Sequence, residues 1–312
     1  MSVKTKRVIL ALFLSVFLIF STTILAHAYS SILAFGDSLS DNGYYQGYPG
    51  GTPGNINSLD IYGFRRYSNG PVWVEYLAGP SHLNVPLLDL AYGGATTASD
   101  NPAAYQATGN PYYQSATGLQ WQVAAYELRF GNSNSISPTT LVTLWAGGND
   151  MFNLRSANAA ADNIELAIQN LYAIGGRSFL IPNLSYNDND PYKLWKQPFD
   201  IELALDLAAL TANPLYLGIN IMALDMNDFV PTGINHYDGT WMGHYMPSDD
   251  VPDMGPGTYA WWDTVGVHPT TEVHTQIADY AAAATEVPEP ATMLLLGSGL
   301  LGLWGFRKKF KK

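Results

Sequence analysis

Five short apolar runs, separated by stretches of helical character, constrain this fold more than any other feature of the sequence. Continuous apolar runs of this length are typical of parallel strands that are buried on both faces. Each run ends in small or polar residues; the third, for example, leads into Gly147-Gly148-Asn149-Asp150. Polar strand ends of this kind predict a functional site beyond the carboxyl edge of the sheet. The runs cover residues 32–35, 87–91, 141–145, 178–181 and 217–222.

Helical spacing of apolar residues appears between the later runs and after the last one. Residues 159–173 have this spacing and stop at Gly175-Gly176, a C-cap signal. Residues 201–212 have it too, and an amphipathic helix that includes Val273 and Ile277 follows near the end. This alternation of strands and helices predicts a doubly wound, flavodoxin-like α/β/α sandwich with a mostly parallel five-stranded sheet.

Two long segments do not fit simple connections in such a sandwich. Residues 41–67 and 95–121 are rich in Gly, Pro, Asn and Tyr. Loops of this length are usually functional or disordered. Their tyrosines, with Trp121, can wall a cleft for an acyl chain or a sugar ring, since aromatic faces suit both. Packing of surface loops explains the same composition, and both readings stay open.

The N-terminal residues 1–28 have the composition of a secretory signal peptide. They combine a basic start, an apolar run and the small residues Ala26 and Ala28 before the cleavage point that a signal peptidase reads. An uncleaved membrane anchor is the alternative interpretation. The signal peptide predicts that the mature chain begins near Tyr29. The length of the stretch between the two processed ends predicts that residues 29–285 form one domain with a large core.

The C-terminal residues 286–312 form a second processing segment. Pro288-Glu289-Pro290 leads into a short apolar stretch, and the chain closes on a cluster of basic residues. This tail resembles the PEP-CTERM sorting signal of Gram-negative bacteria. The resemblance implies transient membrane anchoring, removal of the tail by an exosortase-type enzyme, and a protein of the cell envelope, outer surface or medium. A permanent transmembrane helix is the alternative, although the apolar stretch is short for one.

Charge and cysteine content exclude several classes of function. The formal net charge is −11, and much of the basic charge lies in the two processed ends. An acidic surface argues against nucleic acid and against an anionic membrane face. The chain contains no cysteine. A cysteine nucleophile, thiolate metal ligands and a disulfide framework are therefore excluded.

The first apolar run ends in a turn that presents a serine. Residues 36–43 read GDSLSDNG, so Ser38 directly follows a predicted strand. A serine hydroxyl needs a base, a group that orients the base, and donors for the oxyanion. His268, just before the final helix, is the candidate base, and Asp263 is the candidate orienting carboxylate.

Two further strand ends supply candidate oxyanion donors. A glycine at Gly94 lets a backbone N–H point into a cleft, and Asn149 offers a side-chain amide. With the N–H of Ser38 they give three donors, although ordinary turn chemistry explains either segment taken alone. The remaining histidines of the mature chain are expected to be surface or packing residues. His268 and His274 do not share a helical face, which argues against a metal site.

Taken in order, these pieces resemble the GDSL-type esterases and lipases of the SGNH hydrolase superfamily. Residues 36–43 match the first block of that family, and residues 91–97 (AYGGATT) match the second. Residues 147–150 (GGND) match the third, and His268-Pro269-Thr270 matches the last. Residues 66–73 also resemble a segment that precedes a family helix. The resemblance implies Ser38 as nucleophile, His268 as base, an oxyanion hole of Ser38, Gly94 and Asn149, and no cofactor.

One departure from the family pattern affects the orienting residue. The family places its aspartate three residues before the histidine, where this chain has Val265, and Asp263 lies five residues before. Either Asp263 keeps the role through a two-residue insertion, or a Ser-His dyad relies on a backbone carbonyl. The expected activity is hydrolysis of lipid, phospholipid or acetylated-sugar esters through an acyl-enzyme. The alternative is a non-catalytic, polysaccharide-binding surface or matrix protein on a hydrolase scaffold.

Overall fold

The computed structural model describes residues 29–43, 66–68, 70–102, 117–131, 135–188, 190–232 and 268–285. The predicted signal peptide, the sorting tail, most of the two Tyr-rich segments and Asp263 lie outside these residues. Among the described helices none has the length and apolar character needed to cross a membrane. The transmembrane helix considered for the C-terminal tail falls outside the part of the chain that this finding covers.

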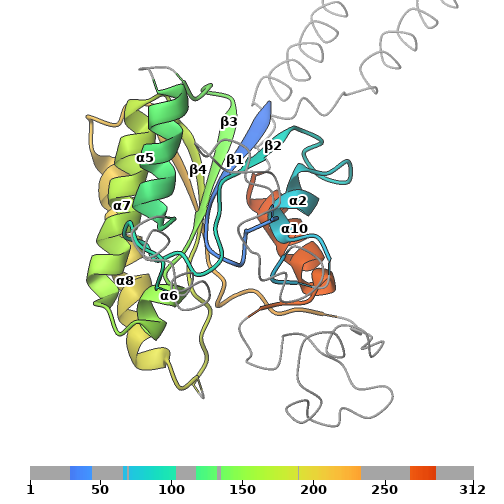
Figure 1. The fold of residues 1–312 in the computed structure, drawn as a ribbon, viewed down its shortest axis with the longest axis vertical. Coiled ribbons are helices and arrows are strands. Elements are labelled where there is room, and N and C mark those ends of the chain that lie inside the picture. Colours follow the sequence, from blue (N-terminus) through green and yellow to red (C-terminus); the bar gives the residue numbers. More distant parts are fainter. Residues whose placement is uncertain are drawn as a thin grey trace, which may run out of the picture.

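The described residues form a five-stranded sheet in the order β2-β1-β3-β4-β5. Every strand pair in it is parallel, so the predicted sheet is confirmed and has no antiparallel member. Parallel neighbours need crossover connections, and the helices that provide them cover both faces of the sheet (Figure 1). The strands are β1 (Ser31–Gly36), β2 (Leu87–Asp89), β3 (Thr140–Trp145), β4 (Ser178–Pro182) and β5 (Asn220–Leu224).

Helices α5 (Leu119–Phe130), α7 (Ala157–Ala173) and α8 (Lys193–Ala212) pack on one face of the sheet. Helices α2 (Trp73–Ala78) and α10 (Thr271–Thr285) pack on the other. The short α6 (Gly148–Phe152) directly follows the turn after β3 (Figure 1). This two-sided arrangement confirms the doubly wound architecture predicted from the sequence.

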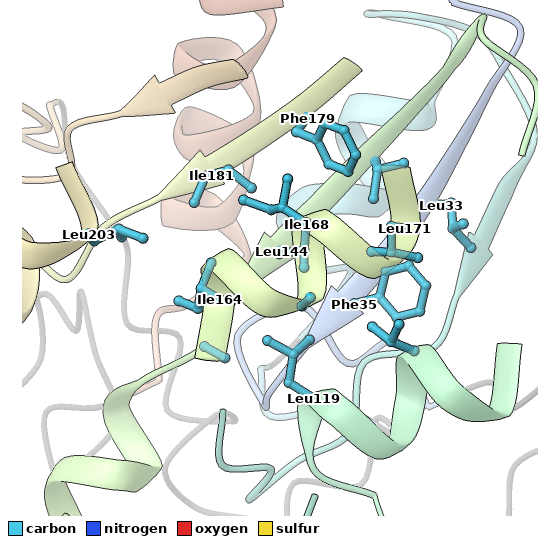
Figure 2. Packing of buried hydrophobic residues seen from close by; sticks show 14 of the residues in the cluster. Leu33, Phe35, Leu119, Leu144, Ile164, Ile168, Leu171, Phe179, Ile181 and Leu203 are labelled. Carbon is cyan, nitrogen blue, oxygen red and sulfur yellow. The ribbon is translucent and has the colours of Figure 1, made fainter. Parts of the chain in front are cut away.

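The larger core lies between the sheet and helices α5, α7 and α8. Figure 2 shows its apolar side chains converging from strands and helices. Phe35 and Leu144 are fully buried and come from the neighbouring inner strands β1 and β3, which explains why both strands are mostly apolar. Ser156 caps the start of helix α7, and its side chain accepts a hydrogen bond from the backbone N–H of Ala159. The residues of this core that Figure 2 labels are Leu33, Phe35, Leu119, Leu144, Ile164, Ile168, Leu171, Phe179, Ile181 and Leu203.

Two element starts and one whole helix differ clearly from the sequence-based expectations. Strand β5 begins at Asn220, because Leu217 is exposed and Gly218 has a φ of 76° in the connection before it. Helix α8 begins at Lys193 rather than at 201, in spite of a proline inside it. Helix α5 was not predicted at all. One of its inward positions is Gln122, a fully buried polar residue that interrupts the apolar pattern.

The second core joins α2 to α10. The ring of His274 is fully buried there, and its Nδ1 accepts a hydrogen bond from the backbone N–H of Trp73 over 3.2 Å. An accepting Nδ1 requires the neutral ring with its proton on Nε2. Burial, and then the nearby charge of His268, lowers the pKa of His274 to about 3. The prediction that His274 is a packing residue agrees with this position.

A buried neutral histidine should make folding stability depend on acidity. Below its ordinary pKa the unfolded chain binds a proton at His274 that the folded chain does not bind, so acidification favours unfolding. We expect wild type to lose roughly 2 kcal/mol more than His274→Gln between about pH 6.5 and about pH 4.5. Urea unfolding of both proteins at the two pH values measures this difference. Equal losses would show that His274 is protonated in the folded state.

Candidate active site

The nucleophile turn begins where β1 meets β3. Gly36 has a φ of 144°, and a Cβ there would lie 2.2 Å from the carbonyl oxygen of Trp145, so only glycine fits. Beyond it, the carbonyl of Asp37 accepts the N–H groups of Ser40 and Asp41. The Asp37 carboxyl also accepts the N–H of Leu39 over 3.0 Å. These bonds fix a tight turn that holds Ser38 at the carboxyl edge of the sheet.

The structure places His268 beside Ser38. The Nε2 atom of His268 lies 2.9 Å from Ser38 Oγ, across 230 residues of sequence. The ring of Tyr67 packs against the imidazole, with centroids 5.0 Å apart. Ser68 donates a hydrogen bond over 2.9 Å to the carbonyl of Pro269, the residue after the histidine. The segment with Tyr67 and Ser68 therefore helps to hold His268 in reach of the serine.

Gly94 and its loop also lie at this edge. Gly94 has a φ of 81°, which favours glycine. Its neighbour Gly93 donates its N–H to Asp41 over 2.7 Å, and a Cβ on Gly93 would lie 2.1 Å from the Tyr67 ring. Among the described residues, no acceptor binds the N–H of Gly94 or that of Ser38. These two N–H groups are therefore available to an incoming oxygen atom.

Asn149 connects the glycine loop to the nucleophile turn. It stands in the first turn of α6, and its Nδ2 donates to the carbonyl of Ala95 over 3.0 Å. The same nitrogen lies 3.4 Å from Oδ2 of Asp37. The next residue, Asp150, is buried and accepts both the N–H and the hydroxyl of Thr97 over 2.8 and 2.9 Å. Helix α6 thus fixes the loop after β2 relative to Ser38.

Several buried carboxyl groups surround these donors. Burial raises the pKa of Asp37 to about 7, and the charges of Asp150 and Asp41 add to the effect. Burial also raises the pKa of Asp89 well above its usual value, and it raises that of Asp150. Asp89 accepts the N–H groups of Ala91 and Asn42 over 2.9 and 3.1 Å. The acids therefore connect the backbones of the two turns that meet at Ser38.

Trp73 is a site-supporting residue that sequence reasoning missed. Its backbone N–H binds His274 in α10, and its indole N–H donates over 3.1 Å to Ser40 in the nucleophile turn. Trp73 therefore contacts the serine turn through its fully buried side chain and the helix that follows His268 through its backbone. Trp73 ends the segment 66–73, which resembles a family block. That resemblance was the one sequence feature that could have indicated its supporting role.

The described residues also contain a cluster of three acidic residues with the spacing of a cation site. Carboxylate oxygens of Asp162, Glu202 and Asp206 lie within 4.8 Å of one another. They stand on α7 and α8, elements that carry none of the predicted catalytic residues.

Of the residues predicted for the site, the structure brings Ser38, His268, Gly94 and Asn149 to one edge of the sheet. Asp263 lies outside the described residues.

Comparison with known proteins gives two family matches. Residues 32–281 match the GDSL-like lipase/acylhydrolase family, and residues 286–309 match the PEP-CTERM protein-sorting motif.

Two curated relatives were found. Phosphatidylcholine-sterol acyltransferase of Aeromonas hydrophila is 33% identical over 163 residues, which cover 50% of this chain and 45% of that protein. Thermolabile hemolysin of Vibrio parahaemolyticus is 28% identical over 211 residues, which cover 67% of this chain and 43% of that protein. The matches therefore span less than half the length of either relative.

Among solved structures, a member of the lipolytic G-D-S-L family from Veillonella parvula is similar to this chain. It is 17% identical with a TM-score of 0.43, and the match covers 81% of this chain and 96% of that one.

Proposed function

The chain belongs to the GDSL-like lipase/acylhydrolase family, and we propose that it hydrolyses carboxylic esters through an acyl-enzyme formed on Ser38. The observation that carries this proposal is the 2.9 Å approach of His268 Nε2 to Ser38 Oγ, at the edge where Gly94 and Asn149 also lie. The sorting motif at residues 286–309 indicates an exported protein. We also propose that an exosortase-type enzyme removes the C-terminal tail.

Acylation begins with the hydroxyl of Ser38 donating its hydrogen bond to His268 Nε2. As Oγ attacks the ester carbonyl carbon, its proton passes to Nε2, and the carbonyl oxygen becomes an oxyanion. The N–H groups of Ser38 and Gly94 and the amide of Asn149 donate to that oxygen. The tetrahedral intermediate collapses when the bond to the alcohol oxygen breaks, and His268 gives its proton to the departing alcohol.

Deacylation repeats these steps with water as the nucleophile. His268 takes a proton from water, which attacks the acyl carbon, and the proton then returns to Ser38 Oγ as the acid leaves. The imidazolium that forms twice in this cycle needs a partner at Nδ1. We propose Asp263 for this role, with a backbone carbonyl as the alternative.

The substrate is proposed from the relatives as well as from the site. The name of the Aeromonas hydrophila relative gives phosphatidylcholine and sterol as the partners of acyl transfer by that protein. We therefore propose a phospholipid acyl ester as the first substrate to test, ahead of acetylated polysaccharide. In both cases the reacting group is an ester carbonyl, so the proposed chemistry is unchanged.

Reaction with a fluorophosphonate probe tests the nucleophile directly. We expect the full chain to form one adduct, and peptide mapping to place it on Ser38. Ser40, two residues away, is a matched internal control because it is fully buried and accepts the indole N–H of Trp73. An unlabelled but folded protein would contradict the proposal and favour a non-catalytic polysaccharide-binding protein. An adduct elsewhere would exclude Ser38 as the nucleophile.

A further inference from the structure

Both N–H bonds of the Asn149 amide are directed at protein acceptors in the resting site. Its Nδ2 lies 3.0 Å from the carbonyl oxygen of Ala95 and 3.4 Å from Oδ2 of Asp37. A primary amide nitrogen has only two hydrogens. If Asn149 donates to an oxyanion, as the proposed function requires, one of these two contacts has to be given up.

The contact with Asp37 is the weaker of the two by distance. At 3.4 Å it lies beyond the usual range for an N–H donor and an oxygen acceptor, whereas the bond to Ala95 lies within it. Asp37 directly precedes Ser38, so the weaker contact belongs to the same turn as the reacting serine. Release of that hydrogen leaves the bond to Ala95 intact, and Asn149 stays oriented.

We propose that Asp37 is a positioning residue that competes with the substrate oxyanion for the Asn149 amide. As a carboxylate Asp37 retains the amide hydrogen, and as a neutral acid it releases it. The inference rests on the proposed function, because it concerns the same oxyanion hole. Its physical basis is that a hydrogen bond to an ionised acceptor is roughly twice as strong as one to a neutral acceptor. A carboxylate would also repel the negative oxygen that forms beside it.

The surroundings of Asp37 allow this change of charge near neutrality. The side chain is buried, and burial raises its pKa to about 7. The acids that face it are Asp41, from its own turn, and Asp150, from α6, and both raise the pKa further. The N–H of Leu39 and the Asn149 amide act in the opposite direction. Three further titratable groups of the described residues lie at this edge: His268 through its contact with Ser38, Tyr67 against the His268 ring, and Asp89 through the N–H of Asn42.

The test compares how kcat depends on pH in Asp37→Asn and in wild type. The substrate is p-nitrophenyl butyrate, read at a wavelength where product absorbance is independent of pH. Both proteins are measured over the same pH range, and the ratio of their kcat values is followed. We expect the ratio of variant to wild type to rise about tenfold between about pH 6 and about pH 9, with KM little changed. The cause is that only wild type acquires the carboxylate.

Asp89→Asn is the matched control. Asp89 is a buried acid at the end of β2, the strand beside β1. It accepts two backbone N–H groups and has no contact with Asn149. Loss of its charge tests for a general effect of removing a buried acid near the site. We expect its ratio to wild type to stay flat across the same range.

A second variant keeps the inference testable if Asp37→Asn fails to fold. In Asn149→Ala the donor itself is absent, so its deficit relative to wild type should shrink as wild type loses the same donor at high pH. A flat ratio for either folded variant would overturn the role of Asp37. Turnover that depends on Ser38 together with flat ratios would leave the proposed function standing, whereas absence of both turnover and probe labelling would remove the proposed function itself.

Discussion

Replacement of Ser38 by alanine is expected to lower kcat for short p-nitrophenyl esters by about 10⁴-fold to 10⁶-fold. The substitution removes only Oγ, the hydroxyl oxygen that lies 2.9 Å from His268 Nε2. Without it the covalent path is closed, and any remaining acceleration comes from the oxyanion donors acting on water. Initial rates at saturating ester, with active enzyme counted by folded protein, measure the effect.

Ser40→Ala separates loss of the nucleophile from damage to the turn. Both serines lie in the same turn, but Ser40 is fully buried and faces Trp73. We expect Ser40→Ala to lower the unfolding free energy by about 1–3 kcal/mol, because it leaves the buried indole N–H of Trp73 unpaired, and to retain most of kcat. Turnover by folded Ser38→Ala at the wild-type rate, or equal losses in both variants, would exclude Ser38 from the chemistry.

The sequence predicted the sheet because each strand carries its own local signal. Run 32–35 is apolar throughout and run 141–145 is apolar except for Thr143, as expected of strands buried on both faces. Helix α5 carried no comparable signal. Its inward side chain Gln122 binds both the N–H and the carbonyl of Gly36, so the helix docks on β1 through polar atoms as well as apolar ones.

The grouping of Ser38, Gly94 and Asn149 at one edge could be expected from topology. Parallel strands bring their carboxyl ends to the same side, and each of these residues follows such an end. The support around them could not be predicted in the same way. Tyr67, Ser68 and Trp73 reach α10 or the residues just before it from about 200 positions away, and contacts over that distance leave no period in the sequence.

The long-range contacts of Trp73 predict the second large effect. The side chain is fully buried, its indole packs edge to face with Trp145 at 5.7 Å, and its two N–H groups bind Ser40 and His274. Trp73→Ala removes the packing and the bond to Ser40 together. We expect the unfolding free energy to fall by about 3–5 kcal/mol, which is typical of large aromatic deletions in a core.

Phe179→Ala is the control for packing alone. Phe179 is equally buried, but it comes from β4 and lies in the core formed with α7 and α8 (Figure 2). Both alanine variants should lose similar stability in urea. Only Trp73→Ala should also lose about tenfold or more in kcat under conditions where both stay folded. The reason is that the serine turn then loses its hydrogen bond to the residue whose backbone N–H binds His274 in α10.

Trp73→Phe tests the polar contact while most of the packing remains. The indole N–H is lost, and the buried Ser40 hydroxyl is left without that donor, at a cost of about 1–3 kcal/mol. Its kcat should lie between those of wild type and Trp73→Ala. Equal kcat in folded Trp73→Ala, Phe179→Ala and wild type would mean that the serine turn and α10 keep their relative position without Trp73. In that case the contacts of Tyr67 and Ser68 would be sufficient to hold His268 in place.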